Sequence, residues 1–516
     1  MRLNACLRIV TADRLACKAS TDLSMFGQMS VDSKISQSSS EPIHGESSNQ
    51  QIEMTSRTPC DAVDCAEGRG VEGRGVEGRG VEGRGVEVGY ESTRKSPEME
   101  FVPVEPKDLF ESGLSEAEIE SLILKFLHFY GCSLGRHLSE QIKLPFGIVK
   151  SILDGLKNQL LVAYRNFVGV NDYEYELTND GRDKAKRLTE LCSYCGAAPV
   201  GFNKYVESVE RQSLQSTRIG LPQIQQALKG LHLPTGILEQ LGQAVNSGRC
   251  ILLHGESGNG KTSVATRCVD AYEDGIWIPR TLAVCGEIVR FYDPTVHQTL
   301  PTQPADSLLR KSIVDQRWVR IKRPGIIVGG ELNLEHLEIS QNRHSGILEA
   351  PIHMKSNNGC LVVDDLGRQR LSISELFNRW IIPMENGHDY ICLPNGRKIQ
   401  SPFDQLLIFS TNMKEKCLSD EAFFRRIPYK IQLSGPSDSQ FIEIFIDLAQ
   451  MAGFVEPEGI CDYLISKIME FRQSLKFCYA SDIIKQCSEF CDFHSQDRIL
   501  DKNMIDKVIL NYFGDL

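Results

Sequence analysis

The stretch that decides the fold reads, from residue 255 to residue 262, Gly255-Glu256-Ser257-Gly258-Asn259-Gly260-Lys261-Thr262. It has the G-x-x-x-x-G-K-[ST] pattern, follows the apolar run 250–253 and precedes a helix-compatible segment, 263–267. A strand, a glycine loop and a helix start, in this order, form the context in which the pattern cradles phosphate. A chance glycine turn is the alternative, and the flanking strand and helix disfavour it. The stretch therefore predicts binding of a nucleoside triphosphate.

The residue types of this loop explain the prediction. Glycines let backbone N–H groups close on the phosphates, and the N-terminus of the following helix adds a partial positive charge. Lys261 is expected to reach the terminal phosphates, and the Thr262 hydroxyl to bind Mg²⁺. The expected nucleotide contacts are Gly255, Glu256, Ser257, Gly258, Asn259, Gly260, Lys261, Thr262 and Ser263.

Length and composition limit the class of protein. The chain has 516 residues, of which 41% are hydrophobic and 24% charged, so two or three folded domains are expected. The net charge of −11 gives no overall attraction to nucleic acid or to an anionic membrane. The 17 cysteines are scattered and odd in number, which is typical of reduced cytosolic thiols. No signal-peptide core and no membrane span are evident, so we expect a cytoplasmic protein with no membrane partner.

Residues 1–105 have the composition of a disordered, low-complexity arm. Ser, Gln, Glu and Gly dominate 28–58, and residues 67–86 are four copies of Glu-Gly-Arg-Gly-Val. The repeat could be a flexible arm that contacts RNA or an acidic partner. It could also be a translated DNA repeat without a selected role. The second interpretation is favoured because Glu cancels the charge of Arg in every copy.

Residues 106–190 have the element order of a winged helix-turn-helix. Helical spacing and a capping box at Ser115 are followed by two β-like runs and a further helix. Such a domain docks either DNA or protein. Lys150 and Lys157 on the third helix are accompanied by Asp154, so the electrostatic signal for DNA is weak and both targets stay open. The expected elements are helices 115–130, 134–142 and 146–158, strands 160–167 and 173–177, and a helix from 178.

Residues 191–249 are expected to be a linker with two lead-in helices. Cys192 and Cys195 have the spacing of half a zinc site, but no second Cys/His pair lies nearby. An incidental pair is therefore the favoured interpretation.

From residue 250 to residue 435 strands and helices alternate. The run Cys360–Val363 ends in Asp364 and Asp365, which places two carboxylates at the tip of a buried strand, where ligands sit in open α/β sheets. Asp364 is expected to hold Mg²⁺ through water, and Asp365 to orient or deprotonate an attacking water. A plain turn after the strand is the alternative. The separation of about a hundred residues from the glycine loop suits two strands of one nucleotide domain and favours the functional interpretation.

A third buried strand, 406–411, ends in Asn412, whose amide can hydrogen-bond the attacking water or the terminal phosphate. Asn395-Gly396 between two apolar runs predicts a hairpin before this strand. Arg425 and Arg426 follow about a dozen residues later. Either arginine could act in trans on the phosphate held by a neighbouring subunit, and a surface ion pair is the alternative.

Together these stretches resemble an AAA+ ATPase over roughly residues 220–516. Walker A lies at 255–262, Walker B at 360–365, sensor 1 at Asn412 and the arginine-finger position at Arg425 or Arg426, followed by a helical lid, 436–516. The resemblance implies an α/β fold of the P-loop NTPase class, with a parallel sheet core and a lid. The hairpin resembles the pre-sensor hairpin of MoxR-type ATPases. Together with the winged helix, the chain resembles a bacterial group of predicted AAA ATPases described as chaperones and loosely linked to Flp pilus assembly.

Two positions depart from that family pattern. The second Walker B acid is usually Glu, and here Asp365 is one methylene shorter. The sensor 2 arginine is not evident at the start of the third lid helix, which periodicity places at Ser481. Lys476 and Arg472 are the nearby cations that could take its place.

The resemblance implies ATP and Mg²⁺ as cofactors and a ring-shaped homo-oligomer, a hexamer in many family members. The expected function is an ATP-hydrolysing remodelling motor whose winged helix docks a protein or DNA target. The alternative is an ATP-gated switch or transcription regulator with little hydrolysis, which Asp365 and the missing sensor 2 favour. A small-molecule kinase explains neither the strand before Asn412 nor the lid.

Overall fold

The computed structural model describes residues 101–167, 172–301, 314–413, 424–455 and 459–514. The arm up to residue 100, including its repeats, lies outside these described residues. Phe101 packs edge-on against Trp318, and Val104 forms a β-bridge with Val314, so the described chain is already packed before residue 106. Among the described residues no helix is long and apolar enough to cross a membrane.

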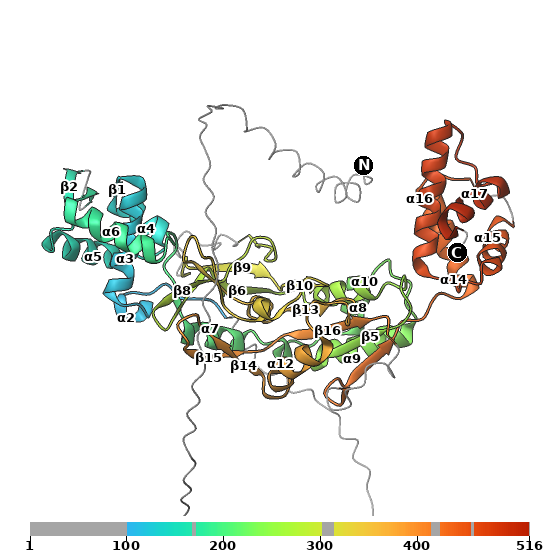
Figure 1. Cartoon of the computed structure of the whole chain (residues 1–516), viewed down its shortest axis with the longest axis horizontal. Coiled ribbons are helices and arrows are strands. Elements are labelled where there is room, and N and C mark those ends of the chain that lie inside the picture. The colour runs from blue at the N-terminus through green and yellow to red at the C-terminus, as the bar shows by residue number, and fades with distance from the viewer. Residues whose placement is uncertain (1–100, 168–171, 302–313, 414–423, 456–458, 515–516) are drawn as a thin grey trace, which may run out of the picture. The chain divides into compact units, whose positions relative to one another are not determined.

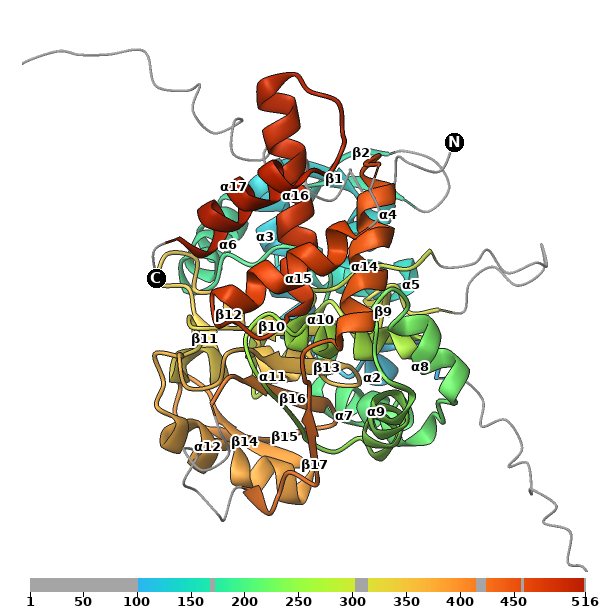
Figure 2. The same ribbon diagram turned by 90° about the vertical axis from the view of Figure 1, so that its right-hand side faces the viewer.

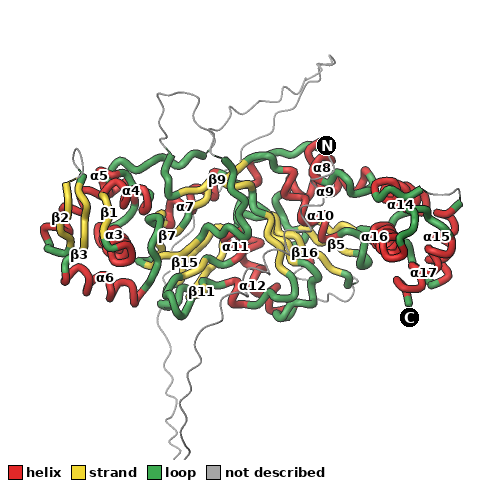
Figure 3. The backbone as a smooth tube through the Cα atoms, turned by 90° about the horizontal axis from the view of Figure 1, so that it is seen from above, coloured by secondary structure: helices red, strands yellow, loops and turns green. Residues whose placement is uncertain are grey.

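A five-stranded parallel sheet forms the centre of the domain that contains the glycine loop (Figure 3). Every neighbouring pair of strands is parallel. The strands, in spatial order, are β10 (Gly325–Val328), β13 (Cys360–Val363), β16 (Leu406–Thr411), β5 (Ile251–His254) and β17 (Tyr429–Gln432). This order places β5, which precedes the glycine loop, directly beside β16, which ends next to Asn412.

Successive residues of these strands enter two different hydrophobic cores. Ile251 and Leu253 pack in one core, and Leu252 packs in the other. Because both faces of the sheet are covered at its centre, β5, β13 and β16 are continuous apolar runs, whereas the edge strands β10 and β17 expose alternate residues. The helices of this domain are α8 (Leu221–Ala227), α9 (Thr235–Ser247), α10 (Lys261–Arg267), α11 (Ile352–Lys355) and α12 (Ile373–Asn386).

A second sheet is built from the linker and from two insertions in the nucleotide domain. Its strand order is β11 (Ser340–Gln341), β12 (Leu348–Glu349), β8 (Glu287–Arg290), β7 (Thr281–Val284) and β4 (Val200–Gly201), and α7 (Phe202–Arg211) follows β4. Residues 275–290 contribute strands to two different sheets. One strand ends before Arg280 and the next begins after it. As a result β7 pairs with β8, while β6 (Gly275–Pro279) pairs with β9 (Trp318–Lys322).

The expected hairpin before Asn412 is present as β14 (His388–Cys392) and β15 (Lys398–Pro402), which pair antiparallel. Gly396 lies in the turn with a φ of 81°, a conformation that glycine adopts without strain. This agreement follows from local turn chemistry.

The helices and strands expected in 106–190 are also present, and Figure 1 shows them in colours from blue to blue-green. Asp172 accepts hydrogen bonds from the backbone N–H groups of Gly135 and Arg136, at 3.0 and 3.1 Å. It therefore satisfies the first N–H groups of the helix that begins at Gly135. The elements are α2 (Leu109–Ser112), α3 (Glu116–Tyr130), β1 (Cys132–Leu134), α4 (Gly135–Ile142), α5 (Phe146–Asn158), β2 (Val162–Phe167), β3 (Tyr173–Leu177) and α6 (Asn179–Leu191).

Four C-terminal helices pack around one hydrophobic core (Figure 2). They are α14 (Asp438–Met451), α15 (Ile460–Glu470), α16 (Phe477–His494) and α17 (Lys502–Phe513). The predicted start of the third helix at Ser481 is wrong. α16 begins at Phe477, because Tyr479 and Ala480 are already buried on the face that Ile483 continues. Lys476 is therefore the residue that immediately precedes the helix.

A buried ion pair joins three segments that are distant in the sequence. The guanidinium of Arg317 is fully buried and donates to both carboxylate oxygens of Asp315 at 2.8–3.1 Å. It also donates to the carbonyl oxygens of Ser112, in α2, and Pro199, just before β4. Because a buried charge needs its partners, this arginine ties α2 to the second sheet.

We predict that Arg317→Ala lowers the free energy of unfolding by about 3–5 kcal/mol, because it leaves the Asp315 carboxylate buried and unpaired. Urea unfolding followed by circular dichroism measures the loss. Arg343→Ala, at an exposed position, is the matched control and should change stability by less than about 0.5 kcal/mol. Equal stability of the two variants would contradict the role of the buried pair.

Candidate nucleotide-binding site

The glycine loop leaves the carboxyl end of β5 and enters α10 with backbone angles that require glycine. Gly255 has a φ of 143°, and a Cβ atom built on it would lie 2.3 Å from the carbonyl oxygen of Leu433. Gly260 has a φ of 76° at the residue before α10. A side chain at either position would strain the loop, so the loop keeps its backbone N–H groups close to the surface at which a phosphate would bind.

Lys261 is buried inside this loop. Its Nζ donates to the carbonyl oxygens of Gly255 at 3.0 Å and of Glu256 at 2.8 Å. Burial lowers the pKa of Lys261, and the nearby Lys476 lowers it further, while Asp365 and Asp364 oppose the shift. The ammonium group is thus held at the loop by neutral carbonyl groups, from which phosphate oxygens can attract it.

Asp364, at the tip of β13, faces Thr262 at the start of α10. The Thr262 hydroxyl lies 3.0 and 2.9 Å from the two carboxylate oxygens of Asp364, and the Ser410 hydroxyl also donates to Asp364. A hydroxyl and a carboxylate are oxygen ligands of the kind that Mg²⁺ prefers. No group of three or more His, Cys, Asp or Glu side chains within the described ranges could hold a metal ion. This donor set fits an ion completed by phosphate and water oxygens.

Asp365 and Asn412 meet at the same edge. The Asn412 amide donates to Asp365 Oδ1 at 2.9 Å, and Arg368 lies 3.6 Å from the other carboxylate oxygen. Asp365 has a φ of 50°, in the left-handed region that non-glycine residues seldom adopt. Gln369 donates to the carbonyl oxygens of Asp364 and Asp365, at 2.7 and 3.3 Å, and holds this turn.

The structure adds Ser410 and Gln369 to the predicted site. Ser410 lies two residues before Asn412, and a strand places residues two apart on the same face. That alternation is the signal that could have identified Ser410 from the sequence. Gln369 gave no such signal, because its role depends on a turn that the sequence does not specify.

Of the predicted nucleotide contacts, Glu256, Ser257, Thr262 and Ser263 are exposed. Asn259 is buried, and its amide donates to the carbonyl oxygen of Leu433 at 3.4 Å. Its Oδ1 atom has no hydrogen-bond partner within the described part of the chain. Unsatisfied buried polar atoms are rare in folded proteins, and they gather at functional sites.

The segment before α16 lies against the glycine loop, a contact that the sequence did not predict. Ser474 Oγ donates to Glu256 Oε2 at 2.9 Å, and Lys476 Nζ lies 3.8 Å from the same oxygen. The backbone N–H of Cys478 donates to the carbonyl oxygen of Gly258 at 3.1 Å. The lid therefore touches the loop directly, and Lys476, not Arg472, is the lid cation at this place.

The two predicted finger arginines do not join this group. Arg426 forms an ion pair with Glu385 at 2.5 Å, whereas Arg425 is exposed. Both line a cavity of about 680 Å³ together with Cys250, which directly precedes β5. The arginines thus lie at the amino end of β5, while the glycine loop lies at its carboxyl end.

Comparison with known proteins gives a distant resemblance. Residues 437–511 match a family model described as a domain of unknown function, DUF8689. A search of curated proteins finds no significant match. A RuvB mutant of Thermotoga maritima aligns with a TM-score of 0.31 and 13% identity over 58% of this chain and 72% of that chain. NtrX of Brucella abortus, in complex with ATP, aligns with a TM-score of 0.35 and 12% identity over 55% and 58%. Both structural alignments are distant, with identities of 12–13%.

Proposed function

We propose that this protein binds and hydrolyses ATP as an oligomeric AAA+ motor that remodels a target. The observation that carries the proposal is the meeting of four side chains from three strand ends: Lys261 and Thr262 after β5, Asp364 after β13, and Asn412 after β16. These groups can bind phosphate, hold Mg²⁺ and position a water, which are the tasks of phosphoryl transfer to water.

Each side chain has a distinct task in this proposal. Lys261 leaves the two loop carbonyl groups and binds the terminal phosphates. Thr262 and Asp364 hold Mg²⁺, which when bound neutralises charge on the phosphate oxygens. Asp365 accepts a proton from the attacking water, and Asn412 fixes the orientation of the Asp365 carboxylate through the 2.9 Å hydrogen bond.

In this proposal the second active-site component comes from a neighbouring subunit. Arg425 is the proposed finger, because Arg426 already pairs with Glu385. Arg425 lies at the opposite end of β5 from the glycine loop, which supports its action on the phosphate held by a neighbouring subunit. The expected assembly is a ring of six copies. The winged helix would dock the protein or DNA target. Two of its cations are already engaged in the structure: Lys157 lies over the Tyr164 ring at 3.8 Å and Arg165 contacts Cys132.

An ATP-gated switch with little hydrolysis is the second candidate. The observation that favours it is Asp365 itself: its side chain is short, and both of its oxygens are already engaged, one by Asn412 and one by Arg368. A carboxylate held in this way is a poorer acceptor for a water proton. Turnover measurements separate the two candidates.

Lys261→Ala is expected to weaken ATP binding, because it removes the buried ammonium that meets the phosphates. Asp365→Asn is expected to keep ATP binding and to lower turnover by about a hundredfold or more. Binding is measured by titration with a fluorescent ATP analogue, and turnover by phosphate release. Lys398→Ala, on the exposed hairpin, is the control. An equal loss of ATP binding in Lys261→Ala and Asp365→Asn would contradict the role proposed for Asp365.

Turnover per subunit is expected to rise with protein concentration, because the active site is shared between copies. Arg425→Ala should flatten this dependence and lower the maximal rate by about 10³-fold or more, whereas Arg426→Ala should change it less. Tight ATP binding with background turnover at every concentration would instead establish the switch.

The contact of Glu256 with residues 474–478 is expected to hold that segment against the glycine loop when no nucleotide is bound. Glu256→Ala removes the acceptor of Ser474 and Lys476. Because the contact is exposed, the loss is about 1 kcal/mol or less, which corresponds to roughly a fivefold faster backbone hydrogen exchange over 474–478. Mass spectrometry measures the exchange, and exposed Glu239→Ala is the control. Unchanged exchange would show that Glu256 does not restrain the lid.

A further inference from the structure

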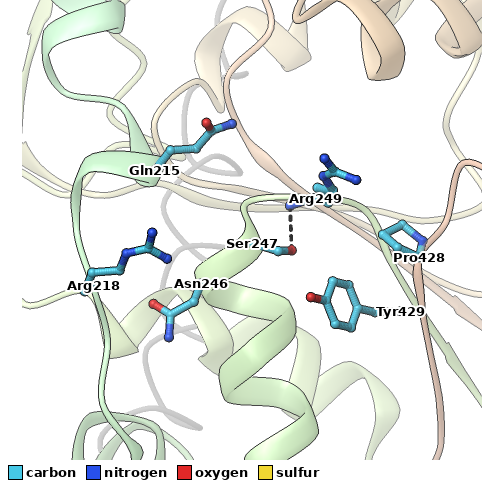
Figure 4. Close-up of a pocket in the computed structure, with 7 residues that line it drawn as sticks. All are labelled: Gln215, Arg218, Asn246, Ser247, Arg249, Pro428 and Tyr429. Carbon is cyan, nitrogen blue, oxygen red and sulfur yellow. Dashed lines mark hydrogen bonds between the residues drawn. The ribbon is translucent and has the colours of Figure 1, made fainter. Parts of the chain in front are cut away.

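A second cavity lies at the amino end of β5 and β17, away from the glycine loop. Its volume is about 390 Å³, which is within the size range of small-molecule sites. Figure 4 shows Arg218 and Tyr429 on opposite sides of it, with the polar ends of both side chains turned toward each other. The described residues that line the cavity are Gln215, Arg218, Asn246, Ser247, Arg249, Pro428 and Tyr429.

The lining is cationic and rich in hydrogen-bond donors. Arg218 and Arg249 supply two guanidinium groups, Gln215 an amide and Tyr429 a hydroxyl. None of the described lining residues is acidic, although the whole chain has a net charge of −11. Within the described ranges no carboxylate is seen to pair with Arg218 or Arg249. Two like charges on one cavity repel each other, and a bound anion would relieve that repulsion.

The backbone around the two arginines is held firmly. The Asn246 side chain accepts from the backbone N–H of Ile219 at 2.8 Å and donates to the Ile219 carbonyl oxygen at 2.6 Å. These bonds attach the segment that carries Arg218 to the end of α9. At the next residue, Ser247 Oγ accepts from the backbone N–H of Arg249 at 3.1 Å (Figure 4). The two arginines are therefore kept on one cavity by contacts that use neither guanidinium group.

Guanidinium groups whose donors have no partner within the described ranges suit a phosphate group, because their fork of donors matches its oxygens. A guanidinium can donate two parallel hydrogen bonds to phosphate oxygens, and such bonds are about twice as strong as neutral ones. Amide and hydroxyl donors beside them supply further contacts to the remaining oxygens.

We propose that the cavity formed by Arg218, Arg249 and Tyr429 is a second phosphate-binding site, separate from the glycine loop. Its ligand is a phosphate-bearing molecule of nucleotide size. The bound phosphate groups belong either to a ligand free in solution or to a nucleotide held by the glycine loop of a second copy of the protein. Arg249 also lines the neighbouring cavity, which contains Arg425 and Arg426, whereas Arg218 and Tyr429 line only this one of the two.

The first experiment measures binding of a free ligand, and it does not rest on the proposed ATPase activity. Inorganic tripolyphosphate is titrated calorimetrically into the full-length Lys261→Ala variant, in which the glycine loop is impaired. Adding Arg218→Ala and Arg249→Ala is expected to weaken binding by about tenfold or more, because charge-assisted hydrogen bonds are lost. Adding Arg187→Ala and Arg343→Ala, which removes two exposed arginines elsewhere, is the control matched in charge.

The second experiment tests whether the cavity binds the phosphates of a nucleotide held by a second copy. This experiment rests on the proposed function. Phosphate release per subunit is measured against protein concentration for the Arg218→Ala/Arg249→Ala variant with an intact glycine loop. A loss of the concentration dependence, with ATP binding at the loop preserved, identifies the second copy as the source. A normal concentration dependence together with weakened tripolyphosphate binding identifies the free ligand.

The proposal is overturned if the cavity variant equals its charge-matched control in both experiments. In that case Arg218 and Arg249 are solvated surface charges. The substitutions are expected to leave the fold intact, because the Arg218 and Arg249 side chains are exposed and the Asn246 and Ser247 hydrogen bonds do not use them. Melting temperatures of the variant within about 2 °C of the control verify this. If wild-type protein shows no turnover at all, the proposed function fails, while the calorimetric experiment still decides the second site.

Discussion

The parallel pairing of β5 with β16, and of β16 with β13, is the constraint on which the nucleotide site depends. In a parallel sheet all strands end at the same edge. Residues that follow the strands at positions 254, 363 and 411 therefore become neighbours, although more than 150 positions separate the first from the last. Hydrophobic burial of both sheet faces supplies the driving force, and the polar strand tips are the groups that this burial leaves at the edge.

The same sheet also has polar residues at the edge where its strands begin. We propose different roles for the groups at the two ends of β5. The carboxyl end presents glycines, a buried lysine and carboxylates, an arrangement suited to a nucleotide with its metal ion. The amino end presents arginines around two neighbouring cavities and is suited to phosphate without a metal ion. Within one copy the strand of four residues, about 13 Å long, separates these two ends, so in the proposed function the arginines of one copy would act on a phosphate held by another.

The contacts between the lid segment and the glycine loop show how nucleotide binding could be transmitted. Glu256 in the loop accepts from Ser474 and attracts Lys476, while Gly258 accepts from the backbone of Cys478. An incoming phosphate competes for the same cation. In the proposed function, exchange of one anionic partner for another would couple nucleotide binding at the loop to the position of α16, and through its hydrophobic core to the whole helical bundle.

The sequence by itself determined the features that arise from local chemistry. The glycine loop, the apolar strands ending in Asp364 and Asn412, the Asn395-Gly396 hairpin and the amphipathic helices follow from residue type and spacing, and each appears in the structure. Only the tertiary structure decided the rest. The choice of Lys476 over Arg472 depends on where α16 begins, the pairing of Arg426 with Glu385 joins residues 41 positions apart, and the cavity of Arg218 and Arg249 lies between α9 and β17. These are contacts between distant segments, set by how the cores pack, and periodicity along one chain carries no record of them.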